Sequence, residues 1–160
     1  WYFSDDYVEL VKESAYGAQG DAAAASDKAT LATSLSTLLR LFAPFLPFTT
    51  EEVWSWWQEG SIHRAAWPEY THLEALAQGA DAALIDDVAE VLTQVRKVKS
   101  DAKASMRAEI SSATVAAPDA QGERIALAAA DIKAAGRITE LSISSGDQLR
   151  VAATLAPVTE

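Results

Sequence analysis

The sequence contains no cysteine and only two histidines, His63 and His72, among its 160 residues. Without thiols the chain has no disulfide scaffold, no thiol nucleophile and no cysteine-ligated zinc, and two histidines are too few for a histidine-rich metal site. No apolar run reaches the roughly 18 residues that cross a bilayer, because Arg40, Pro44 and Pro47 interrupt the best candidate. We therefore expect a cytoplasmic chain that binds no metal and contacts no membrane.

Glycine and proline are also scarce, with 7 and 5 residues, whereas apolar residues make up 49% of the chain. This composition is typical of a globular protein with a buried core, and the length suits one domain or two small ones. The chain begins at Trp1 rather than at a methionine, and no basic segment of the kind that opens a signal peptide follows it. We expect the sequence to be part of a longer protein.

Positive charge is scarce overall, since 13 basic residues face 23 acidic ones and the formal net charge is −10. An excess of this size argues against a general nucleic-acid coat. Local charge decides whether a phosphate backbone can dock, however, and one short segment gathers several basic residues around a single acidic one, Asp101. These basic residues are Arg96, Lys97, Lys99, Lys103 and Arg107.

Apolar residues at helical spacing predict that the first half of the chain is helical. Helices are expected from about Ser4 to Gly17, from Ala22 to Phe42 and from Thr49 to Gly60. Thr49 and Glu52 have the spacing of a capping box, which places the start of the third helix at Thr49. Residues 61–68 have no helical period and are expected to form an extended loop.

The second half combines one long helix with short strands. The long helix is expected from about Asp81 to Ser105, a strand over 111–117, a helix over 123–135, and two further strands over 138–144 and 149–155. Gly146 and Asp147 separate the last two strands, which favours a β-hairpin. The fold class is therefore α+β: a mainly helical bundle over residues 1–78, followed by the long helix and a small α/β module over residues 79–160.

The basic segment falls on the expected long helix. At about 100° per residue, Arg96, Lys99, Lys103 and Arg107 share one sector beside the apolar stripe. Cations three to four residues apart on one helix face can follow consecutive phosphates of an RNA stem. The alternative is a solvated helix face whose aliphatic stems cover apolar surface.

Three ordered blocks resemble a known family. Residues 7–12 (YVELVK), 38–54 (LLRLFAPFLPFTTEEVW) and 61–68 (SIHRAAWP) look like the anticodon-binding helical domain of the class I aminoacyl-tRNA synthetases for valine, isoleucine and leucine. Residues 95–110 (VRKVKSDAKASMRAEI) are similar to the C-terminal region of valyl-tRNA synthetases. The absence of cysteine fits these enzymes better than the isoleucyl ones, many of which end in a cysteine-ligated zinc module.

The resemblance implies an accessory region that holds the anticodon arm of tRNA(Val) during ATP-dependent aminoacylation by a catalytic domain absent from this chain. The HIGH-type and KMSKS-type motifs of catalytic domains are missing. Residues 97–100 (KVKS) resemble the KMSKS motif only superficially, because they fall on an expected helix and not on a mobile loop. We therefore expect no catalytic residue and no cofactor here, with ATP bound by the parent enzyme. The expected partners are tRNA and the catalytic and editing domains of the parent chain.

The same resemblance implies that the bundle is truncated at its start and that the family's C-terminal coiled-coil arm is missing. Lost helices would expose apolar surface, which we expect near Trp1, Tyr2 and Phe3 and which could support self-association.

Residues outside the basic segment also have expected roles. Trp54 and Trp57 are expected on the buried face of their helix, which leaves Trp56 half exposed, either to stack on an RNA base or because a covering helix is absent. Phe45, Leu46 and Phe48 are expected to fill the core. His63 is expected to fix its loop to the bundle through a hydrogen bond.

The candidate tRNA-binding residues are thus Arg96, Lys97, Lys99, Lys103, Arg107 and Trp56. Two alternatives stay open. The chain could belong to an isoleucyl- or leucyl-tRNA synthetase, or it could be a helical protein–protein interaction module whose basic stripe meets an acidic partner.

Overall fold

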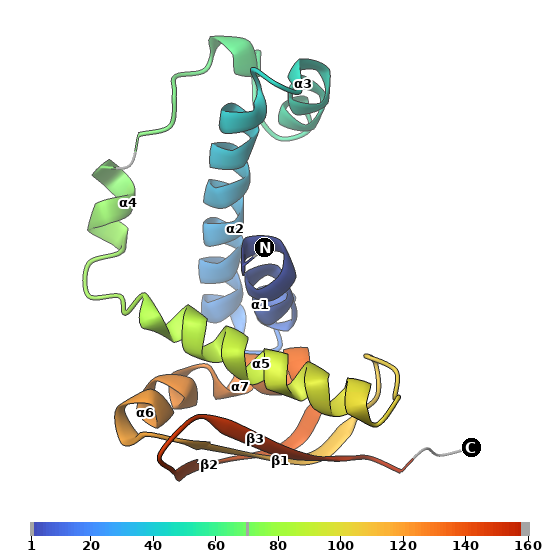
Figure 1. Ribbon diagram of the computed structural model, residues 1–160. Coiled ribbons are helices and arrows are strands. Elements are labelled where there is room, and N and C mark those ends of the chain that lie inside the picture. The colour runs from blue at the N-terminus through green and yellow to red at the C-terminus, as the bar shows by residue number, and fades with distance from the viewer. Residues whose placement is uncertain (1, 70, 158–160) are drawn as a thin grey trace. The chain divides into compact units, whose positions relative to one another are not determined.

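The structure, a computed structural model, describes residues 2–69 and 71–157 (Figure 1). The chain divides into two compact units. The helical unit comprises residues 21–80, and the α/β unit combines the residues up to Gly20 with those from Asp81 onward. Residues 2–20, which the sequence pattern places in a bundle over 1–78, group with the second half of the chain.

The helical unit has a small core. It contains α2 (Asp21–Phe42), α3 (Pro47–Ser55), the short 3₁₀ helix η2 (Ile62–Arg64) and α4 (Thr71–Leu76). Leu39, Ala43, Trp54 and Ile62 form the buried cluster where α2, α3 and η2 meet. Gly60, whose φ is +73°, stands in the connection between α3 and η2, where a left-handed backbone favours glycine.

The start of α3 corrects two expectations. The helix begins at Pro47, whose fixed φ suits a first helical position, so Thr49 lies inside the helix and the expected capping box is wrong. The buried residues of α3 are Thr50 and Trp54, four apart and on one face. Phe45, Leu46 and Phe48 are exposed instead of filling the core, with Phe48 89% exposed.

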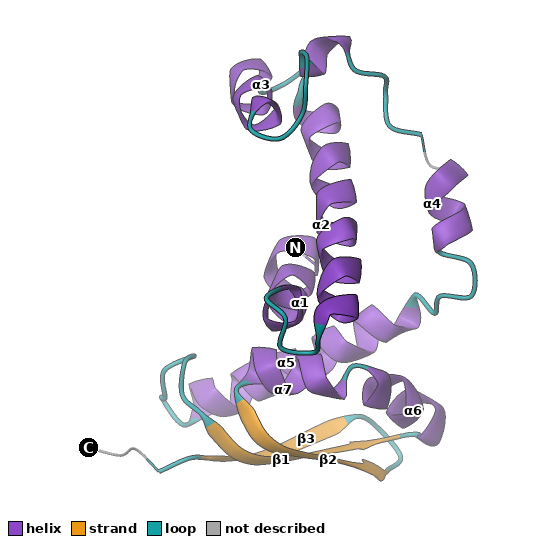
Figure 2. Ribbon diagram, turned by 180° about the vertical axis from the view of Figure 1, so that it is seen from behind, coloured by secondary structure: helices purple, strands orange, loops and turns teal. Residues whose placement is uncertain are grey.

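The α/β unit is built on a three-stranded sheet. Its helical elements are the π-helical turn η1 (Tyr2–Tyr7), α1 (Val8–Ala15), α5 (Ala83–Asp101), α6 (Asp119–Leu127) and α7 (Ala129–Gly136). Its strands are β1 (Ile110–Ala117), β2 (Ile138–Ser145) and β3 (Arg150–Leu155). Figure 2 shows α5, α6 and α7 on one face of the sheet. The α+β class is therefore confirmed.

The strand order is β2-β1-β3, with β1 parallel to β2 and antiparallel to β3. The expected hairpin is wrong, because β1 lies between the two strands that were to form it. Parallel pairing needs a long crossover, which α6 and α7 supply. After β2 the chain crosses the end of β1 at Gly146, whose N–H donates to the Ala117 carbonyl at 2.9 Å. A Cβ at Gly146 would lie 3.1 Å from that of Ala116, so the crossing leaves almost no room for a side chain.

The core of the α/β unit lies between the sheet and α5. Apolar residues of α5 at helical spacing are buried against the strands and against the crossover helices; they are Val88, Val91, Leu92 and Val95. Ile110, Val115, Ile125 and Ile132 fill the facing positions. Leu10 of α1 belongs to the same cluster, which explains why the first residues group with this unit.

Buried polar groups around α5 are paired. The Asp87 carboxylate accepts from Arg124 Nε at 2.6 Å and from Gln121 Nε2 at 2.7 Å, which joins α5 to α6. Gln94 receives the Val151 N–H at 2.8 Å and donates to the Leu149 carbonyl at 3.3 Å, which joins α5 to the start of β3. These bonds fix the register of α5 over the sheet.

Among the described residues, no helix has the length and hydropathy that crossing a membrane requires.

Removing a core side chain should test this packing. Ile132 on α7 is fully buried, so Ile132→Ala should lower the free energy of unfolding by about 2–5 kcal/mol. Leu127, at the end of α6, is 80% exposed, and Leu127→Ala should change it by less than about 0.5 kcal/mol. Urea denaturation followed by circular dichroism would measure both. Equal effects of the two substitutions would contradict the assigned core.

Candidate nucleic-acid interface

The basic segment does not form the single helical stripe that its spacing suggests. The helix α5 ends at Asp101, so Lys103 and Arg107 lie in the connection to β1 rather than on the helix. Lys103 has a φ of +51°, which turns the chain away from the helix axis. The five basic candidates therefore have different surroundings.

Arg96 is tied to the start of the chain. Its Nη1 lies 2.9 Å from Asp6 Oδ1, and its Nη2 donates to the Asp5 carbonyl at 3.0 Å. The Asp6 side chain is mostly buried, with 13% exposed, whereas that of Arg96 is 44% exposed. Arg96 thus holds η1 against α5 and is only partly available to an external phosphate.

Lys99 is buried, with 2% of its surface exposed. Its ammonium donates to the carbonyl of Gly136 at 2.9 Å and to that of Met106 at 3.1 Å. Burial lowers the pKa of Lys99, and the positive charge of Arg137 acts in the same direction. The expectation that Lys99 lies on the surface is wrong, because the end of α7 and the connection to β1 cover this position of α5.

Lys97, Lys103 and Arg107 are exposed. In the part of the chain that the structure describes, none of these side chains forms an ion pair. Of the basic candidates, these three are the ones whose charge is free to meet an external anion.

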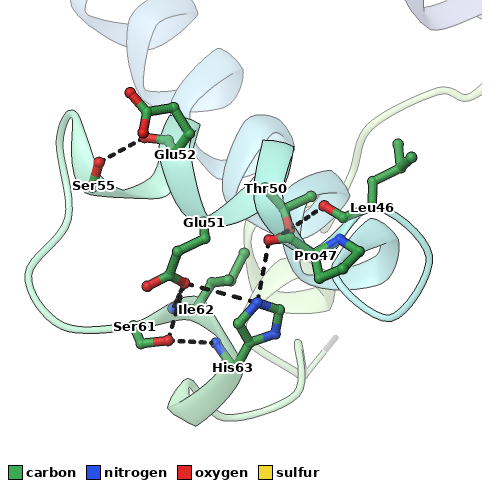
Figure 3. Close-up of polar contacts among 9 residues, drawn as sticks. All are labelled: Leu46, Pro47, Thr50, Glu51, Glu52, Ser55, Ser61, Ile62 and His63. Atoms are coloured by element: carbon green, nitrogen blue, oxygen red, sulfur yellow. Dashed lines mark hydrogen bonds and ion pairs between the residues drawn. The ribbon is translucent and has the colours of Figure 1, made fainter.

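A network of polar contacts fixes the loop after α3 (Figure 3). Glu51 Oε2 accepts from Ser61 Oγ and from the Ile62 N–H, both at 3.0 Å. His63 Nε2 lies 3.2 Å from the Pro47 carbonyl, to which it donates when that nitrogen carries the proton. The expected role of His63 is therefore confirmed. Glu51 serves the same purpose, which its sequence context did not reveal.

Aromatic side chains stand out from α3. Trp56 is 70% exposed, and its Nε1 donates to Glu52 Oε1 at 3.2 Å. Phe48, Glu52 and Trp56 are four residues apart, which places them along one face of the helix. We call Phe48 and Trp56 the aromatic surface of α3; Phe45, in the turn before the helix, is also exposed. The sequence pattern indicated only Trp56, because Phe45 and Phe48 had the pattern of core residues. Trp54 is buried as expected, but the expectation that Trp57 is buried is wrong, because its side chain is 38% exposed.

Among the first residues, the side chain of Phe3 is 39% exposed. Phe3 stacks on Tyr7 with ring centroids 5.8 Å apart. Trp1 and the side chain of Tyr2 lie outside what the structure describes. Nothing in the described surface supports self-association through this segment.

Comparison with known proteins decides between the open alternatives. The sequence model of a family described as the anticodon-binding domain of tRNA ligase matches residues 1–115. The chain belongs to this family. The matched range includes the whole helical unit, α5 and most of β1 of this anticodon-binding domain.

Curated relatives extend the likeness to the α/β unit. The domain is 50% identical to the valine–tRNA ligase of Thermobifida fusca over 98% of this chain and 18% of the relative. It is 46% identical to that of Salinispora tropica over 92% of this chain and 19% of the relative. It is 46% identical to that of Leifsonia xyli subsp. xyli over 95% of this chain and 17% of the relative. The domain thus spans less than a fifth of these relatives, and their names favour valine over isoleucine or leucine.

The buried charge of Lys99 should appear in the pH dependence of stability. A base whose pKa is lower in the folded than in the unfolded chain binds fewer protons when folded, so stability rises with pH between the two values. We expect unmodified protein to gain free energy of unfolding relative to Lys99→Met as pH rises from neutral toward 10.5, the ordinary pKa of lysine. Urea denaturation at several pH values measures this difference.

Lys97→Met is the matched control, because Lys97 is exposed on the same helix. Its stability should follow that of the unmodified protein across the same pH range. A constant difference between unmodified protein and Lys99→Met would contradict the lowered pKa.

Proposed function

We propose that this domain holds tRNA(Val) by its anticodon arm while a catalytic domain elsewhere in the protein attaches valine in an ATP-dependent reaction. The observation that carries the proposal is the match to the anticodon-binding family over residues 1–115. The names of the curated relatives support valine as the amino acid. ATP, the catalytic domain and the editing domain belong to the rest of the protein in this proposal.

The two units suit two kinds of RNA contact. The exposed cations of the α/β unit, Lys97, Lys103 and Arg107, can neutralise backbone phosphates, which sets position and salt dependence. The helical unit carries seven acidic and three basic side chains, which disfavours phosphate there. Its aromatic surface on α3 can instead stack on unpaired bases, as RNA-binding proteins do with splayed loop nucleotides.

The mechanism is docking. The chemical reaction occurs on another domain, so this domain contributes by bringing the tRNA to the catalytic domain in a productive orientation. A protein–protein interaction module is the alternative, and it differs by being indifferent to tRNA.

Charge reversal should weaken tRNA binding. The double variant Lys103→Glu/Arg107→Glu should raise the Kd for a tRNA(Val) transcript. It should also lower the slope of log K against log salt by roughly 0.7 to 0.9 for each phosphate that the variant no longer neutralises. Stability should change by less than about 0.5 kcal/mol, because both side chains are exposed. Fluorescence anisotropy at several salt concentrations measures affinity and slope.

The control carries the same change of charge elsewhere on the α/β unit. Lys12 on α1 and Arg150 on β3 are both exposed, and Lys12→Glu/Arg150→Glu should retain more of the affinity and slope. If both double variants bind tRNA as the unmodified domain does, the cations do not contact phosphate.

Removing the exposed indole should weaken binding in a different way. Trp56→Ala should cost about 1–3 kcal/mol of binding free energy, the value of one stacked base, with the salt slope unchanged because stacking releases no counterion. Trp67→Ala is the control, since Trp67 is also exposed but lies in the loop after η2. Titration with the isolated anticodon stem-loop measures both, and equal Kd values for Trp56→Ala and unmodified protein would exclude Trp56 as a stacking residue.

A further inference from the structure

Two cationic residues adopt a backbone conformation that usually favours glycine. Lys103, after α5, has a φ of +51°, and Arg137, after α7, has a φ of +54°. They are the non-glycine residues with positive φ among residues 2–69 and 71–157. Both side chains are exposed, so no core packing requires a large residue at either position. Both residues follow the last turn of a helix, where a left-handed residue commonly ends the helix and glycine is the usual choice.

The buried ammonium of Lys99 connects the two segments that carry these residues. It bonds the carbonyls of Met106 and Gly136, and the residues that follow these two are Arg107 and Arg137. The Ile110 N–H also donates to the Arg137 carbonyl at 2.8 Å, and Ile110 pairs with Ile138 where β1 and β2 begin. Figure 1 shows both strands starting at the same end of the sheet. The segment that contains Met106 and Arg107 therefore lies close to the segment that contains Gly136 and Arg137, although the two are thirty residues apart in the sequence.

Several cations are gathered at this end of the sheet, and acidic side chains lie beside some of them. Lys99 bonds to carbonyls rather than to carboxylates, and Arg107 and Arg137 form no ion pair within the described residues. Glu13 and Glu109 line a cavity together with Arg137 and Lys133, and Glu9 lines a second cavity with Lys99 and Met106. Collecting unpaired cations costs stability, and an external anion would offset that cost.

We propose that Lys103, Arg107 and Arg137 form one surface that binds the phosphate backbone of tRNA, with Lys99 as the positioning residue that holds its two segments together. The proposal rests on the proposed function and adds Arg137, which lies far from the basic segment in the sequence. Two guanidinium groups can each contact a phosphate through paired N–H donors, which a lysine cannot do. RNA is the partner because its phosphates recur along a backbone that a three-cation surface can follow.

Arg137→Gly removes the positive charge while keeping the backbone conformation. Glycine adopts the left-handed backbone without strain, so thermal stability should stay the same or increase. The affinity for a tRNA(Val) transcript should fall roughly five- to eightfold at 0.1 M salt, and the salt slope by about 0.7 to 0.9, as expected when one phosphate is no longer neutralised. Arg150→Gln is the matched control, because Arg150 pairs with Ala116 at the opposite end of the sheet. It should bind tRNA as the unmodified domain does.

Lys99→Met tests the positioning role, since it leaves all three surface cations in place. The affinity and the salt slope should both fall, measured well below the unfolding temperature of the variant. Amide hydrogen exchange in residues 102–109 should become faster, because the Met106 carbonyl loses its partner. A lower unfolding temperature with unchanged affinity and slope would show that Lys99 is structural only, and would overturn its positioning role.

The outcomes distinguish this inference from the proposed function. If the unmodified domain shows no salt-dependent binding of tRNA, both fail. If it binds, and Lys103→Glu/Arg107→Glu weakens binding while Arg137→Gly does not, the proposed function stands and the surface is wrong. If polyglutamate displaces tRNA from the unmodified domain at an equal concentration of charge, the surface is a site for acidic chains and RNA is not its specific partner.

Discussion

The burial of one face of α5 against the sheet is the constraint on which the α/β unit depends. Four side chains of α5 are almost fully buried there: Val88, Val91, Leu92 and Val95. On the strands, Ile110 and Val115 belong to the same buried cluster. A three-stranded sheet cannot cover both of its own faces, so one long amphipathic helix with two shorter ones closes the apolar side. The other face of the sheet remains polar, with Ser112, Thr114, Ser142 and Thr154 exposed on it. Because α5 is fixed in this way, its end and the following connection reach the surface at one defined place.

Electrostatics in this protein is local rather than global. An excess of acidic residues would repel RNA if the charge were evenly spread, but the Debye length at physiological salt is only about 8 Å. The potential at a phosphate near the ends of α5 and α7 therefore depends on the nearby charges, which include the cations and also Glu13 and Glu109. Placing positive charge at helix C-termini also agrees with the helix dipole, whose negative end lies there. The left-handed backbone at Lys103 and Arg137 ends α5 and α7 at these positions.

The helical unit follows a different principle, because its core is small and its aromatic residues are largely outside it. Trp54 and Ile62 are buried, while Phe45, Phe48 and Trp56 are not. Hydrogen bonds hold the surrounding backbone: Glu51 fixes the Ser61–Ile62 turn, His63 reaches Pro47, and Arg40 donates to the Ala66 carbonyl at 3.3 Å. Exposed aromatic rings on a well-fixed helix are suited to stacking, since little conformational entropy is lost when a base binds them.

The sequence by itself determined most of the helices and strands and the family, although it missed η2 and α4 and joined α6 and α7 into one helix. Its apolar periodicity predicted the extents of α2 and α5 to within a few residues, and the block around residues 38–54 was specific enough to indicate an anticodon-binding domain. Only the tertiary structure decided which side chains are accessible. Helical projection placed Lys99 beside Arg96 on an outer face, but α7 packs over that position, and this long-range contact leaves no trace in local spacing. The same holds for β1, which separates β2 from β3 although the turn between them resembles a hairpin, because strand pairing is decided by the crossover and not by the turn. Arg137 lies near the segment that contains Arg107 for the same reason. The two parallel strands β1 and β2 start side by side, and no local sequence pattern predicts this pairing of distant segments.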